Sequence, residues 1–104
     1  MDELEIIQLI DNKINDDLPV VISCEFSGGA HALLAVGMEY DENNDPCKIL
    51  CLDPDTTAPN VNYYNSVIVL NVREKGEYRH DYFNTKDNTI ARVGLQEILI
   101  ITKR

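Results

Sequence analysis

The sequence predicts an α+β fold, in which an N-terminal helix packs on a twisted, mostly antiparallel sheet of five to six strands. Two observations lead to this prediction. Helical periodicity is confined to the first 15 residues, and the remainder consists of short apolar or alternating segments separated by polar turns. Short turns favour antiparallel pairing, because parallel strands need long crossover connections. With 104 residues and no linker or repeat, the chain is expected to form a single domain over residues 1–104.

The predicted helix begins at Asp2 and ends ahead of Pro19. Ile7, Ile10 and Ile14 fall on one face at helical spacing, which gives the helix an apolar side to bury. Asp2 is expected to cap the helix, because its carboxylate can accept from the free N–H groups of the first turn. Pro19 disfavours helical backbone at the residue before it, so the helix should not continue past this point.

Six later segments are predicted to be strands from their β-branched and aromatic residues. They are 19–25, 30–40, 48–53, 66–72, 77–83 and 95–103. The second is long and almost continuously apolar, which is typical of a central strand covered on both faces. The fifth alternates aromatic and polar residues, which suits a half-exposed strand.

The charge balance argues against two classes of partner. The chain has 18 Asp and Glu against 9 Lys and Arg, a net charge of −9. Nucleic acid and anionic membrane surfaces are bound through clustered Lys and Arg, so neither is an expected partner. No apolar run approaches the roughly 18–20 residues of a spanning helix. The acidic N-terminus does not resemble a secretion signal, and the chain is expected in the cytoplasm.

The three cysteines give no sign of a metal site. Cys24, Cys47 and Cys51 are odd in number and lack the paired spacing of zinc ligands, so neither a metal nor another cofactor is expected. A reducing compartment is the simplest setting for them. Cys51 lies inside an apolar run and is predicted to be core, whereas Cys47 lies at a turn and is predicted to be exposed.

His31 and Asp53 are the strongest candidates for a functional pair. His31 opens one predicted strand and Asp53 ends the next. If these strands form a hairpin, the two side chains meet at one rim of the sheet, where the carboxylate would orient the imidazole and raise its basicity. The simpler interpretation is a histidine at a strand start and an aspartate that begins an Asp-Pro turn.

The segments HALLAVGMEY and KILCLDPD resemble the second half of papain-like cysteine peptidases, especially bacterial peptidases of the C39-like type. In that family a strand opens with the catalytic histidine, in a His-Ala-apolar-Val-Gly-Tyr pattern. The next strand ends with an Asp or Asn, often followed by Pro. The upstream LPVVIS is similar to the family's Pro-Val-apolar strand. The resemblance implies half of a papain-like fold, with His31 as general base and Asp53 as the residue that orients it.

The resemblance supplies no nucleophile. In the family the catalytic cysteine opens a long helix well upstream of the histidine, near a Gln that helps to form the oxyanion hole. Here 30 residues precede His31, and the predicted helix holds no cysteine. A base without its nucleophile contributes little to covalent catalysis, so a truncated, non-catalytic domain is expected. The missing half would leave a sheet face uncovered, and a homodimer or another protein is expected to cover it.

Two alternatives remain open. The chain could be a cysteine peptidase, or its His/Asp half, using a cysteine from another chain or Cys24. A hairpin would place Cys24 opposite His31, where an imidazolium would stabilise a thiolate. However, Cys24 has no helix N-terminus to lower its pKa, and a small semi-buried residue is the simpler interpretation. A purely structural module, unrelated to peptidases, would show no contact between His31 and Asp53.

The C-terminal half carries weaker signals. His80 precedes Asp81, but adjacent strand residues point to opposite faces, so they are not expected to form a dyad. Arg79 and His80 are predicted to lie at the surface. Several aromatic residues could line a groove or a partner surface, although half-buried sheet aromatics are the simpler interpretation. They are Tyr63, Tyr64, Tyr78, Tyr82 and Phe83.

Overall fold

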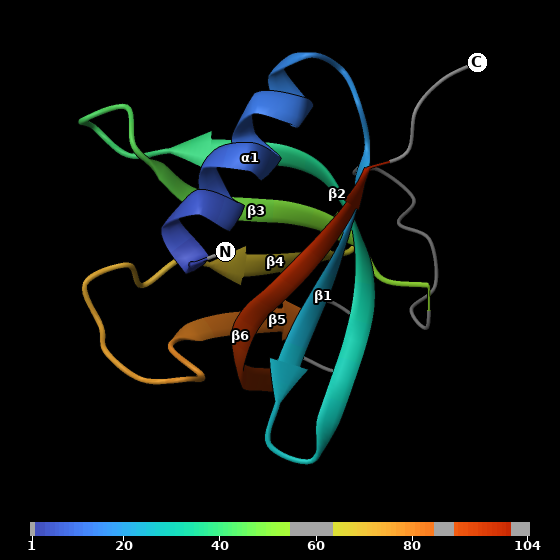
Figure 1. The fold of residues 1–104 in the computed structure, drawn as a ribbon, viewed down its shortest axis with the longest axis vertical. Coiled ribbons are helices and arrows are strands. Elements are labelled where there is room, and N and C mark those ends of the chain that lie inside the picture. Colours follow the sequence, from blue (N-terminus) through green and yellow to red (C-terminus); the bar gives the residue numbers. More distant parts are fainter. Residues whose placement is uncertain (1, 55–63, 85–88, 101–104) are drawn as a thin grey trace.

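The computed structural model, which describes residues 2–54, 64–84 and 89–100, forms a closed antiparallel β-barrel with one N-terminal helix (Figure 1). Each strand pairs antiparallel with the next in sequence, and the first also pairs with the last, which closes the barrel. The elements are α1 (Glu3–Asn15), β1 (Val20–Phe26), β2 (Gly29–Tyr40), β3 (Pro46–Leu52), β4 (Ser66–Val69), β5 (His80–Asn84) and β6 (Thr89–Ile100).

The prediction of an α+β fold, with a helix on one face of an open sheet, was wrong. The strand segments were predicted near their observed places, but the pairing between β1 and β6 was not. This pairing runs from Val20↔Ile100 to Glu25↔Gly94, with a register shift between Ser23 and Cys24. The sheet face that we expected to lie uncovered is therefore turned inward and forms the barrel core.

The helix follows its predicted caps and adds to that core. The Asp2 carboxylate accepts a hydrogen bond from the Glu5 N–H at 2.9 Å, so the predicted cap is confirmed. The buried side chains Ile6, Ile7 and Ile10 join the interior cluster of the barrel. α1 packs against β1, β2 and β6 (Figure 1), so it completes the core instead of lying on an open sheet.

The strand β2 shows the alternation of a barrel wall. Leu33, Ala35 and Gly37 are buried, whereas Leu34 and Val36 between them are half-buried on the outer side. The prediction that this strand would be fully covered on both faces was therefore wrong. The continuous apolar sequence arises from outward-facing residues that form part of a groove described below.

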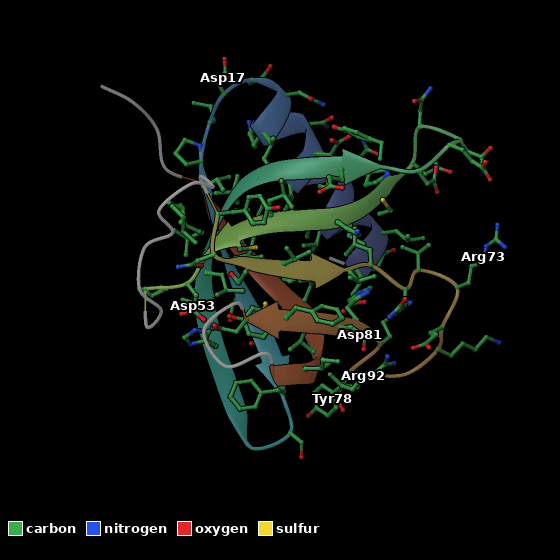
Figure 2. All side chains as sticks on the ribbon, turned by 180° about the vertical axis from the view of Figure 1, so that it is seen from behind. Asp17, Asp53, Arg73, Tyr78, Asp81 and Arg92 are labelled. Atoms are coloured by element: carbon green, nitrogen blue, oxygen red, sulfur yellow. The ribbon has the colours of Figure 1, made fainter. Side chains whose placement is uncertain are left out.

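Two ends of the barrel carry separate polar groups. Figure 2 shows Asp53 at the end of β3, and Asp81 and Arg92 toward the opposite end of the neighbouring strands. The last strand begins at Thr89 instead of residue 95, and β5 begins at His80 instead of residue 77. Tyr63, most of the predicted loop after Asp53, and residues 101–103 of the last predicted strand lie outside the described residues.

Candidate functional site

His31 and Asp53 meet where β2 begins and β3 ends. His31 Nε2 lies 2.8 Å from Asp53 Oδ1, which is the contact predicted from the hairpin. The two residues are not directly opposite each other. The pairing Leu34↔Leu52 sets Asp53 level with Leu33, two residues beyond His31 on the same face, so the contact is diagonal.

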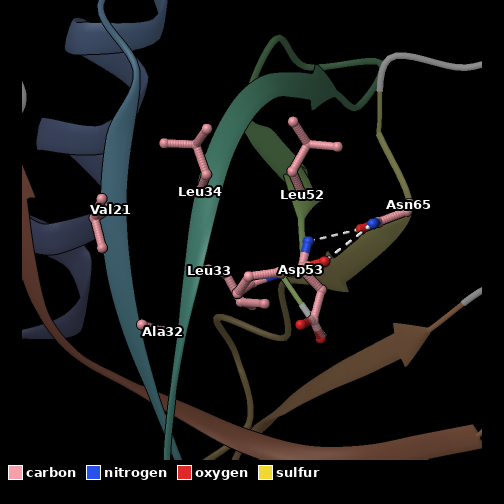
Figure 3. A pocket seen from close by; sticks show the side chains of 8 residues that line it. Val21, Ala32, Leu33, Leu34, Leu52, Asp53 and Asn65 are labelled. Carbon is pink, nitrogen blue, oxygen red and sulfur yellow. Dashed lines mark hydrogen bonds between the residues drawn. The ribbon is translucent and has the colours of Figure 1, made fainter. Parts of the chain in front are cut away.

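The Asp53 carboxylate is held on both oxygens and is only 4% exposed. The Tyr82 hydroxyl donates to Oδ2, and Asn84 Nδ2 donates to the same oxygen at 3.3 Å. The backbone of Asp53 is also fixed. Its N–H donates to Asn65 Oδ1 at 2.7 Å, and its carbonyl oxygen accepts from Asn65 Nδ2 at 3.1 Å (Figure 3). Contacts from β2 and β5 therefore fix the buried carboxylate, and the residue before β4 fixes the backbone that carries it.

The Tyr82 hydroxyl acts as a neutral donor in this arrangement. Burial, together with the hydrogen bond to Asp53, raises the pKa of Tyr82 well above its ordinary value. The phenol consequently keeps its proton at any physiological pH. Tyr82 is the half-buried sheet aromatic that was predicted, and its hydroxyl group also makes it part of the site.

Cys24 lies opposite His31 in the β1–β2 register, as predicted for the hairpin. However, its side chain is only 2% exposed, less than the semi-buried position we expected. Burial, reinforced by the Asp53 carboxylate, raises the pKa of Cys24 to about 12. At pH 7 roughly one thiol in 10⁵ would be ionised. Cys24 is thus a poor nucleophile despite its position.

The other two thiols are no better placed. Cys51 is buried in the core, as predicted, and burial raises its pKa well above the ordinary value. Cys47 is half-buried, so the prediction of an exposed thiol was only partly correct. It lies at the opposite end of β3 from Asp53, six residues or about 20 Å along an extended strand. None of the three cysteines offers His31 an ionisable partner thiol.

An apolar hollow of about 350 Å³ lies on the outside of the barrel beside Asp53 (Figure 3). Val21, Leu34 and Leu52 are aligned across β1, β2 and β3 by the strand register and form its floor. We call this hollow the outer groove, and its full lining is Val21, Ala32, Leu33, Leu34, Leu52, Asp53, Pro54 and Asn65.

His80 does not lie at the surface, and the prediction that it does was wrong. Its side chain is fully buried at the start of β5, and Arg79 beside it is half-buried. His80 Nε2 lies 2.8 Å from Glu3 Oε2. Asp81 points the other way and binds Arg92, so the two neighbours form no dyad, as expected from strand alternation. No local pattern in the sequence signals the contact with Glu3, because it depends on how the helix packs.

Within residues 2–54, 64–84 and 89–100, no cluster of three or more His, Cys, Asp or Glu side chains could hold a metal ion. The helix of this part of the chain is not long and apolar enough to cross a membrane. Comparison of the chain with protein-family models, with curated proteins and with solved structures gave no match.

Proposed function

We propose that this chain is a non-catalytic, cysteine-peptidase-like domain that acts in the cytoplasm by binding protein, and that a second copy of itself is its partner. The observation that carries the proposal is a base-and-orienter pair without a usable thiol. His31 and Asp53 are 2.8 Å apart, yet Cys24 and Cys51 are buried with raised pKa values. The free state of the described thiols fits a reducing compartment.

The outer groove is the surface that best supports protein binding. It presents apolar side chains on the outside of three neighbouring strands, where a water-soluble surface would normally alternate to polar residues. Its lining is almost entirely apolar, which suits an apolar side chain of a partner better than a charged ligand. The earlier expectation of an uncovered inner sheet face is replaced by this outer surface.

Sedimentation velocity tests self-association directly. We expect the wild-type chain to pass from monomer to dimer between about 1 and 300 μM. Leu34→Lys places a charge on the groove floor and should weaken association at least about tenfold. Ile90→Lys is the matched control, because Ile90 is 63% exposed on β6 and pairs with Phe83 of β5, outside the strands that form the groove. A monomer at all concentrations, or equal effects of both variants, would contradict self-association through the groove.

A second candidate function is the His/Asp half of a composite cysteine peptidase. The observation that favours it is the exposure of His31, whose side chain is 28% exposed while Asp53 behind it is buried and fixed. Such an imidazole is oriented and still reachable by a thiol from another chain.

The composite site predicts activity only in a complex. The chain purified with its natural partner should hydrolyse peptides, and iodoacetamide should abolish this activity. His31→Gln should also abolish it without dissociating the complex, whereas Cys47→Ser should leave it unchanged. Peptide hydrolysis that persists in the His31→Gln complex would rule this function out.

A further inference from the structure

We propose that His80 is an acid-sensitive latch, which in its neutral form ties the first turn of α1 to the barrel and which loosens when the imidazole is protonated. The proposal concerns the end of the barrel away from His31 and Asp53, and it does not depend on the proposed function. Its elements are α1, the segment after β4, and the strands β5 and β6.

The hydrogen bonds of His80 assign its protonation state. The Asn71 N–H donates to His80 Nδ1 at 3.0 Å, so Nδ1 must be the unprotonated nitrogen. The Nε2–H then donates to Glu3 Oε2 at 2.8 Å. With the side chain 0% exposed, both ring nitrogens are satisfied by protein groups only in the neutral form.

Glu3 extends this contact to the rest of the barrel. Its Oε1 accepts from the Leu95 N–H of β6 at 2.7 Å. Its Oε2 also lies 2.7 Å from Arg79 Nε, in an ion pair whose N–H does not point at the oxygen. One carboxylate in the first turn of α1 therefore joins β5 and β6, and His80 holds it from inside.

Protonation would disturb the latch at one atom. A proton on Nδ1 would face the Asn71 N–H, so two donors would meet where one hydrogen bond existed. The nearby charges act in both directions, because Glu3 favours an imidazolium whereas Arg79 and Arg92 oppose it. Asp81, on the outer side of β5, is engaged by Asn71 and Arg92. Burial is the largest effect and holds the pKa of His80 below its ordinary value.

The direction of the pH effect follows from the difference between the pKa of His80 in the closed latch and its pKa in the open latch. When the latch is open, His80 is expected to titrate near its ordinary pKa of about 6.5. The closed form binds fewer protons below that pH, so acid favours opening. The opening equilibrium should rise about 30-fold between pH 7.5 and pH 5.0, if the closed form stays neutral over this range.

Hydrogen exchange of the wild-type protein tests the latch, with rates corrected for the intrinsic effect of pH. The α1 amides of Ile6, Ile7 and Ile10 should exchange faster at pH 5.0 than at pH 7.5, by up to about 30-fold relative to intrinsic rates. The amide of Ile49 in β3 should change much less. Imidazole ¹⁵N shifts should show the Nε2–H tautomer of His80 at neutral pH. An Nδ1–H tautomer, or an equal change in α1 and β3, would overturn the proposal.

Two variants distinguish the effect of His80 on the pH-dependent exchange from any effect of His31. In His31→Gln the exchange of α1 should still depend on pH, because His80, the second of the two histidines in the chain, remains in place. His80→Gln should remove this dependence. Should His80→Gln fail to fold, the wild-type exchange and the tautomer measurement still decide the proposal. A His31→Gln protein whose α1 exchange no longer depends on pH would contradict it.

Discussion

Tyr82 donates its hydroxyl hydrogen to Asp53 Oδ2, the carboxylate oxygen that does not face His31. Tyr82 lies on β5 and Asp53 follows β3, so this bond spans two steps around the barrel wall. It fixes the rotation of the carboxylate and leaves Oδ1 directed at the imidazole. A tyrosine on β5 therefore orients the carboxylate that contacts the histidine of β2.

Removing this hydroxyl should cost stability. In Tyr82→Phe the buried Oδ2 of Asp53 loses the hydroxyl donor and keeps the amide of Asn84. We expect the free energy of unfolding to fall by about 1–2 kcal/mol. Urea denaturation at pH 7 measures this change. Tyr78→Phe, ahead of β5 (Figure 2), serves as control and should stay within about 0.5 kcal/mol of the wild type. Equal losses in both variants would show that the bond to Asp53 contributes nothing specific.

Alkaline pH should destabilise the fold through Cys24. Its pKa is raised to about 12 in the folded chain, whereas the unfolded thiol ionises near the ordinary cysteine pKa of 9.0. The unfolded state therefore loses this proton first, and the stabilisation present below pH 9 is lost as the pH rises toward 12. The expected slope is at most about 1.4 kcal/mol per pH unit for this group.

The variant Cys24→Ala isolates this effect when urea denaturation is repeated between pH 8 and pH 10.5. Its absolute stability will fall because a buried side chain is shortened, so the comparison is between slopes. The slope should be shallower in Cys24→Ala than in the wild type, and unchanged in Cys47→Ala. Parallel curves for the wild type and Cys24→Ala would show that the Cys24 thiol is not held protonated.

The three thiols should also differ in their reactivity. Cys24 and Cys51 are buried, whereas Cys47 is half-buried. Alkylation requires an accessible thiolate, so iodoacetamide at pH 8 should label Cys47 alone in the native protein. Mass spectrometry of proteolytic fragments locates the label, and the same treatment in urea should label all three. Native labelling of Cys24 at the rate of a model thiol would restore it as a candidate nucleophile.

The sequence predicts contacts between neighbouring segments and misses those that cross the barrel. The helix cap at Asp2 and the contact of His31 with Asp53 depend on residues within one helix turn or one hairpin, and both are present. Closure depends on β1 pairing with β6, about 75 residues later in the chain, and no local pattern specifies that register.

The contacts of His80 and Tyr82, which the sequence did not predict, depend on that closure. Closure and helix packing together bring β5 beside the start of α1, where His80 meets Glu3. The position of Tyr82 beneath Asp53 likewise requires β5 to follow β4 around the wall. From the sequence, His80 is predicted to be a surface histidine, because its partner Glu3 lies 77 residues away. Tyr82 is predicted to be an ordinary sheet aromatic, because its partner Asp53 lies 29 residues away.

Gly94 offers a test of how closely the segment before β5 packs on β6. It is buried on β6, opposite Glu25 of β1, and a Cβ built on it would lie 2.3 Å from the Glu77 carbonyl oxygen. Because that oxygen belongs to the backbone, the segment before β5 would have to move. Gly94→Ala should therefore lower the free energy of unfolding by about 1–3 kcal/mol.

The matched control for this substitution is Gly29→Ala. A Cβ at Gly29 would meet only the ring of Phe26, at 3.5 Å, which is an ordinary contact. Alanine there should change the stability by less than about 0.5 kcal/mol. Both variants can be compared by urea denaturation at pH 7. If Gly94→Ala were as stable as Gly29→Ala, the segment around Glu77 would not pack on β6 as closely as the structure places it.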